Sequence, residues 1–173
     1  DDPHANAAFL RNTIALQTGR DPARAYIRHY WRHVASPHHA DELASFCPEP
    51  DTTTWLWPAH GVRVDDTLVV FFERLHNEGM PSPWSFVGDG WDARVIADPD
   101  REPSAWEPRP ALLPPDGGIG EVIGEAVVHR GDDALVFGTR GDDHAVTVVR
   151  FAAADVARGD LSRPERRCDD ATF

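Results

Sequence analysis

The chain has 173 residues and a formal net charge of −12, and all of its fixed cations are arginines. This length suffices for one domain with its own core. The acidic balance, without a basic cluster rich in aromatic residues, argues against nucleic acid as a partner, and no apolar run approaches the roughly 20 residues that cross a bilayer, so no membrane partner is expected.

Short β patterns dominate the first hundred residues. Alternating or apolar stretches bounded by turn residues predict strands over 12–19, 60–64, 67–75 and 92–99. Residues 22–35 fit either a helix with proline in its first turn or an outer strand followed by a connection, and the second interpretation is favoured.

Two histidines within that stretch, His29 and His33, are four positions apart. On a helix this spacing would let both bind one zinc ion. Because no third ligand has suitable spacing, a solvated surface is favoured, and neither a metal nor a cofactor is expected.

The second half of the chain continues the β pattern. The proline-rich segment 104–118 excludes a central strand and predicts an edge strand followed by a long connection. Further strands are predicted over 124–130, 133–140 and 144–152. The expected fold class is therefore all-β.

An internal repeat organises these strands. Residues 60–75 align with residues 124–140, and in both copies a short strand, an aspartate-containing hairpin turn and a second apolar strand follow one another. The predicted turns are Asp65-Asp66 and Asp132-Asp133, sixty-seven residues apart, and a third β segment follows each pair. Four-stranded units repeated at such a period are typical of β-propeller blades, whereas an ordinary two-sheet β-sandwich is the alternative.

The propeller hypothesis divides the single domain 1–173 into four parts. These are the end of one blade at 9–35, a second blade at 55–113, a third blade at 119–160 and a tail at 161–173. Since a propeller needs at least about four blades to close, we expect a fragment or a split chain that a second chain or copy completes.

Two motifs point to a family. WPAHG at 57–61 opens the second blade, and GEAVV at 124–128 opens the third. With the order of the strands, these motifs resemble bacterial five-bladed β-propellers of the glycosidase type, in particular the glycoside hydrolase family that contains endo-D-arabinanases. The resemblance implies a secreted or cell-envelope protein that acts on a furanose polysaccharide such as arabinan.

Glycosidic cleavage needs two carboxyl groups on opposite sides of the scissile bond. In such a propeller the innermost strand of each blade begins at the mouth of a central funnel, where we expect His60 and Glu125. Glu125 lies in the apolar frame VIGEAVV, and burial there would raise its pKa towards that of a catalytic acid. The alternative for Glu125 is an exposed or hydrogen-bonded strand glutamate.

The family usually carries another acidic residue on its first blade. In the register used here that blade's innermost strand lies upstream of Asp1, so one catalytic carboxylate is expected to be missing. His60 is predicted to bind a sugar hydroxyl or to set the charge of a neighbouring carboxyl group, and a purely structural histidine is the alternative.

Three further residues are predicted to bind substrate. Trp55 and Trp57 face the same side of a strand, so one can offer its ring to a sugar while the other packs beneath it, unless both belong to the core. Glu73 ends its strand near the same site, and its alternative role is an ion pair with Arg74 or Arg140.

Other interpretations remain open at this point. The protein could be a non-catalytic propeller that binds a glycan or a protein through its aromatic face, or a structural β domain without a ligand site. The two cysteines, Cys47 and Cys168, are either free thiols or a disulfide suited to an exported protein.

Overall fold

The computed structural model describes residues 10–35, 42–77, 79, 85–116, 121–140 and 145–166. Most of these residues form antiparallel strands, so the all-β prediction is confirmed. The strands are β1 (Ile14–Thr18), β2 (Tyr26–Tyr30), β3 (Arg32–Val34), β4 (Glu42–Ala44), β5 (Thr54–Val64), β6 (Thr67–Asn77), β7 (Phe86–Ala97), β8 (Arg109–Pro110), β9 (Glu121–Arg130), β10 (Asp133–Arg140), β11 (Ala145–Ala152) and β12 (Glu165–Arg166). A 3-10 turn (Pro103–Ala105) and the short helix α1 (Ala153–Arg158) complete the described elements.

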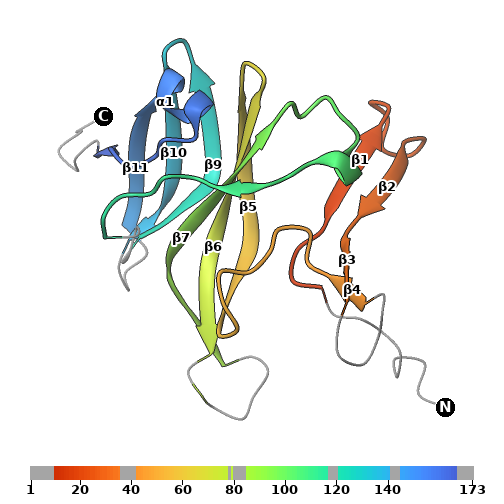
Figure 1. Ribbon diagram of the computed structural model, residues 1–173. Coiled ribbons are helices and arrows are strands. Elements are labelled where there is room, and N and C mark those ends of the chain that lie inside the picture. The colour runs from red at the N-terminus through yellow and green to blue at the C-terminus, as the bar shows by residue number, and fades with distance from the viewer. Residues whose placement is uncertain are drawn as a thin grey trace.

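The strands form three layers, which follow one another along the chain and across Figure 1. The first layer contains the hairpins β1-β2 and β3-β4, the middle layer is the sheet β5-β6-β7-β8, and the last layer is the sheet β9-β10-β11-β12. Both four-stranded sheets are antiparallel meanders in the same order, as the internal repeat predicts. Among the described strands no sheet closes on itself, so closure into a propeller stays a prediction.

The hairpin turn of the last layer differs from the predicted one. The turn between β9 and β10 is Gly131-Asp132, and Asp133 already belongs to β10, where its carboxylate accepts a hydrogen bond from Arg150 at 2.8 Å. Gly131 takes the left-handed conformation (φ 59°) at the first turn position, which glycine adopts without steric cost. The two hairpins are consequently sixty-six residues apart, one fewer than the sequence alignment predicts.

Residues 22–35 form strands rather than a helix, as the favoured interpretation has it. His29 lies in β2 and His33 in β3, so the helical spacing that would let them share a metal does not exist. The described part of the proline-rich segment contains the two-residue edge strand β8, which pairs with β7, and a connection after it, as predicted.

Both faces of the middle layer are buried. One face packs against the last layer and α1 in a core that includes Val69, Phe71, Trp91 and Ile123. The opposite face packs against the first layer in a core made of Phe46, Cys47, Leu56, Phe72, Ile96 and Trp106. This alternation of side chains along β6 follows the two-residue period of a strand.

The first layer is fastened to the rest by a buried asparagine. Asn12 donates hydrogen bonds to the carbonyls of Cys47 and Leu56, and its own carbonyl oxygens accept from the amides of Phe46 and Cys47. Cys47 is a buried free thiol, while Cys168 lies outside the described residues. No helix in the described part of the chain is long and apolar enough to span a membrane.

Candidate functional site

Two bulges bring the middle and last layers together. In β5 the register shifts between Pro58 and Gly61, and in β9 it shifts where two extra residues, Gly124 and Glu125, follow Ile123. Gly124 adopts a φ of 105°, and a Cβ there would lie 2.3 Å from the Cβ of Phe71 on β6. Only glycine fits so close a crossing of β9 over β6.

Glu73 lies on the part of β6 that faces this crossing. It stands opposite Trp57 on β5 and opposite Trp91 on β7, so the three side chains share one face of the sheet. Its carboxylate lies over Gly88, since a Cβ at that position would come within 2.6 Å of Glu73 Oε1. The missing side chain of Gly88 therefore makes the space that the Glu73 carboxylate occupies.

The two glutamates interact electrostatically. The pKa of Glu73 is raised above its ordinary value, first by burial and second by the negative charge of Glu125. Glu125 itself is exposed, and Thr139 Oγ1 on β10 donates a 3.4 Å hydrogen bond to its Oε1. The pair thus combines a half-buried carboxyl group that favours its proton with an exposed carboxylate.

The expected burial of Glu125 is therefore wrong. Of its apolar sequence neighbours only Ile123 and Val127 pack into the core, and the bulge turns Glu125 itself towards solvent. Glu73, which the sequence places only among the substrate-binding residues, is the carboxyl group with the raised pKa.

Aromatic rings stand beside the pair. Phe86 contacts Trp57 edge-on with ring centroids 4.6 Å apart and contacts Trp55 at 6.1 Å, so both tryptophans do lie on one side of β5. The guanidinium of Arg11 stacks over Trp55 at 4.2 Å and helps to bury it, whereas Trp57 is only half-buried. Trp57 is consequently the better placed of the two for stacking on a sugar.

His60 occupies the bulge of β5 and is exposed. Glu125 likewise lies in the bulge of the first strand of its sheet, but at the sixty-six-residue offset of the hairpins the counterpart of His60 is Ala126. The shared position of His60 and Glu125 at a funnel mouth stays a prediction. In the described part of the chain, no group of three or more metal-ligating side chains is arranged to hold a metal ion.

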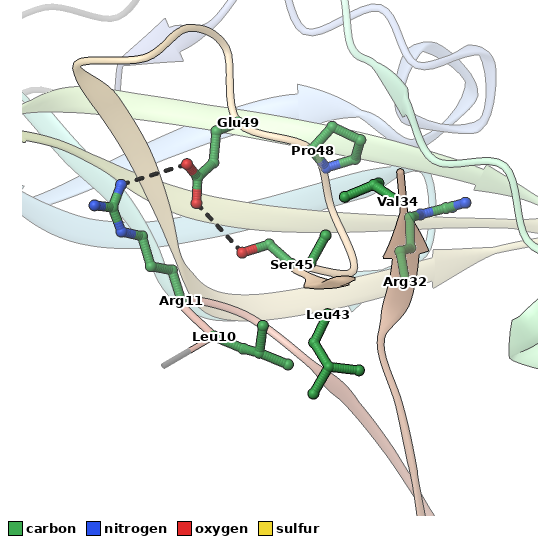
Figure 2. Close-up of a pocket in the computed structure, with 9 residues that line it drawn as sticks. Leu10, Arg11, Arg32, Val34, Leu43, Ser45, Pro48 and Glu49 are labelled. Atoms are coloured by element: carbon green, nitrogen blue, oxygen red, sulfur yellow. Dashed lines mark hydrogen bonds and ion pairs between the residues drawn. The ribbon is translucent and has the colours of Figure 1, made fainter. Parts of the chain in front are cut away.

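A separate hollow lies elsewhere, on the first layer (Figure 2). Its volume is about 470 Å³, and its lining consists of Leu10, Arg11, Arg32, Val34, Leu43, Ala44, Ser45, Pro48 and Glu49. Its charged groups are engaged with one another or with the backbone. Arg11 and Ser45 both donate to Glu49 at 3.3 Å, and Arg32 donates to the carbonyls of Phe46 and Trp106.

This hollow could not be predicted from a motif, because three short segments that are distant in the sequence form it. None of the predicted site residues lines it, and its charged groups already have partners. The carboxyl pair therefore remains the more chemically distinctive site.

None of the family models, curated proteins and solved structures compared with the chain matches it. The family resemblance of the two strand motifs accordingly stays a prediction.

Proposed function

We propose that this protein is a glycoside hydrolase of the β-propeller type that cleaves a furanose-containing polysaccharide such as arabinan. One observation carries the proposal: carboxyl groups from two different sheets, Glu73 and Glu125, interact beside an accessible tryptophan, and the pKa of one of them is raised. The choice of substrate rests on the resemblance of the strand motifs, as does a secreted or cell-envelope location.

The unequal surroundings of the two glutamates suggest a division of roles. Glu73 carries the proton more readily, so it is the general acid that protonates the departing glycosidic oxygen. The exposed Glu125 carboxylate acts on the other side of the bond, either directly on the anomeric carbon or through a water molecule. Thr139 holds Glu125 in place through its hydrogen bond.

Trp57 supplies the sugar contact in this scheme. Its ring is fixed edge-on against Phe86 and lies on the same face as Glu73, so a furanose ring stacked on it would place a glycosidic oxygen towards the carboxyl pair. His60, exposed on the bulge of β5, would donate to a sugar hydroxyl from the neighbouring strand.

The test is product analysis with arabinan and with a panel of unrelated glycans. We expect the unmodified chain to release oligosaccharides from arabinan, and Glu73→Gln and Glu125→Gln each to lower that rate by roughly 10²- to 10⁴-fold, the usual contribution of an acid or base. Glu107→Gln is the matched control, because Glu107 is an exposed glutamate on the connection to β8. Its rate should equal that of the unmodified chain.

Two other results would reject the hydrolase. Binding of arabinan without release of products, weakened by Trp57→Ala, would identify a glycan-binding module instead. Full activity of Glu73→Gln would show that the carboxyl pair is not the catalytic pair.

A further inference from the structure

The middle and last layers stack in the same direction along the chain. When their hairpins are matched at sixty-six residues, Leu68, Val70 and Phe72 correspond to Ala134, Val136 and Gly138. The first three face the first layer, which precedes them, and Ala134 and Val136 face the middle layer, which again precedes them. In both sheets the corresponding face is thus turned towards the preceding layer.

The opposite faces correspond as well, but only one of them is covered. Phe71 in the middle layer is 0% exposed beneath the last layer. Its counterpart Phe137 lies on the outer face of the last layer, where Val128 is 47% exposed and Val146 is 73% exposed. We call this apolar surface of β9, β10 and β11 the outer face; it consists of Val122, Ala126, Val128, Leu135, Phe137, Val146 and Val148.

The first layer lies at the opposite end of the stack from the last layer (Figure 1). Ile14 and Tyr30 pack on the middle layer, so the opposite face of β2, which carries Ile27 (49% exposed), points away from the stack. Leu43 on β4 (39% exposed) adds to this second apolar surface, since it lies on the face opposite Arg32. In the part of the chain that the structure describes, every strongly exposed large apolar side chain except Leu112 belongs to one of these two ends.

The two ends carry small net charges of opposite sign. Residues 10–35 and 42–49 contain five arginines and three acidic residues, and three of these arginines form ion pairs within the chain. Strands β9 to β11 with the β9-β10 turn contain four acidic residues and three arginines. The net charges of the two ends are therefore complementary, although small.

We propose that the outer face of one copy of this chain binds the first layer of a second copy. Inside the chain, the corresponding face of the middle layer is covered by the layer that follows it. In the proposed contact, the first layer of the second copy covers the outer face in the same way, so the direction of stacking is kept. Two outer faces packed against each other would reverse that direction. The contact is heterologous, so copies add head to tail and either close into a ring or extend as a row. The inference does not depend on the proposed hydrolase activity.

The experiment measures the mass of the full chain in solution by light scattering and sedimentation. One double variant, Val128→Asp with Val146→Asp, removes the outer face, and another, Ile27→Asp with Leu43→Asp, removes the outward apolar surface of the first layer. We expect the unmodified chain to have a mass of at least two copies and each double variant alone to be monomeric. Because each variant retains the surface that the other lacks, an equimolar mixture should form a dimer.

A matched control keeps the result specific. Leu112→Asp changes an exposed leucine outside both ends, so its mass should equal that of the unmodified chain, and circular dichroism checks that every variant is folded. A monomeric unmodified chain at its highest soluble concentration overturns the proposal. So does a double variant that still dimerises alone, because a self-paired surface would then hold the copies together.

Discussion

The middle layer and the last layer have the same strand order and the same bulged first strand, yet they differ in how they are covered. The middle layer is buried on both faces, so Val69 and Phe71 on one side and Phe72 on the other are almost completely inaccessible. The last layer repeats the apolar pattern with one face open, and Val146 is 73% exposed. Apolar side chains at equivalent positions of the two sheets therefore contribute unequally to stability, because a following layer buries those of the middle layer and not those of the last layer.

The largest difference between the layers should come from matched core truncations. Phe71→Ala should lower the free energy of unfolding by about 3 to 5 kcal/mol, because it leaves a cavity between two sheets. Phe137→Ala, at the corresponding position of the last layer, should cost roughly 1 to 2 kcal/mol, since its ring is only partly buried. Urea unfolding followed by tryptophan fluorescence measures both, and equal losses would contradict the difference in coverage.

Replacing glycine by alanine should lower the stability by different amounts at the bulges of β9 and β5. Gly124→Ala should cost roughly 2 to 4 kcal/mol, because it combines a left-handed backbone with a Cβ that would lie 2.3 Å from Phe71. Gly61→Ala is the comparison in β5, where the nearest atom to a Cβ would be the Val69 carbonyl oxygen at 3.1 Å and the backbone is not left-handed. We expect Gly61→Ala to cost about 1 kcal/mol or less of stability. Thermal unfolding measures both variants, and a larger loss for Gly61→Ala than for Gly124→Ala would contradict this expectation.

The pH dependence of stability compares Glu73 of the middle layer with Glu125 of the last layer. Since the pKa of Glu73 is raised in the folded protein, its carboxyl group binds its proton more tightly there than in the unfolded chain. Its contribution to stability is therefore present below the ordinary glutamate pKa and is lost as the pH rises through the raised pKa. Glu73→Gln should accordingly be more stable than the unmodified chain at neutral pH but not in acid.

Glu125→Gln is the matched variant in the last layer. This variant removes only the negative charge of Glu125, which is the second cause of the raised pKa of Glu73. The gain in stability should therefore be smaller than for Glu73→Gln and confined to the same pH range. Chemical unfolding at neutral and acidic pH separates the two variants. A gain for Glu73→Gln that does not change with pH would contradict the assignment of the raised pKa.

The smallest effect is expected on the outer face. Val146→Thr should change the stability of the monomer by less than about 0.5 kcal/mol, because the side chain is largely in solvent. Val95→Thr, in the middle layer with 0% exposure, should cost roughly 1 to 2 kcal/mol because it buries a hydroxyl group. Unfolding at low protein concentration isolates these values from association, and similar values for both would indicate that the outer face is covered within the chain.

Much of the architecture follows from local patterns in the sequence. Alternation of apolar residues predicts β6, β7, β10 and β11, and the repeat predicts two meanders in the same order. The hairpin of the last layer is misplaced by one residue because both Gly131-Asp132 and Asp132-Asp133 are good turn pairs. Only the pairing with β9 decides between them.

The candidate site was predictable in its residues but not in their roles. Strand spacing predicts that Trp55 and Trp57 share one face, and the contacts of Phe86 with both rings confirm it. The structure adds Glu73 to that face through its pairing with Trp57. The sequence could not show that the β9 bulge turns Glu125 outwards, nor that Gly88 leaves room for the Glu73 carboxylate, because both depend on contacts between distant strands.

The buried asparagine of the first layer has a consequence for local unfolding. Asn12 ties the start of this layer to Phe46, Cys47 and Leu56, so local opening of the layer must break this cluster of hydrogen bonds together with the apolar contacts of Phe46. The two large sheets can stay packed during such an opening. Cys47 lies directly beneath the first layer, where burial raises the pKa of its thiol to about 11. The labelling rate of that thiol thus reports how often the first layer opens, independently of global unfolding.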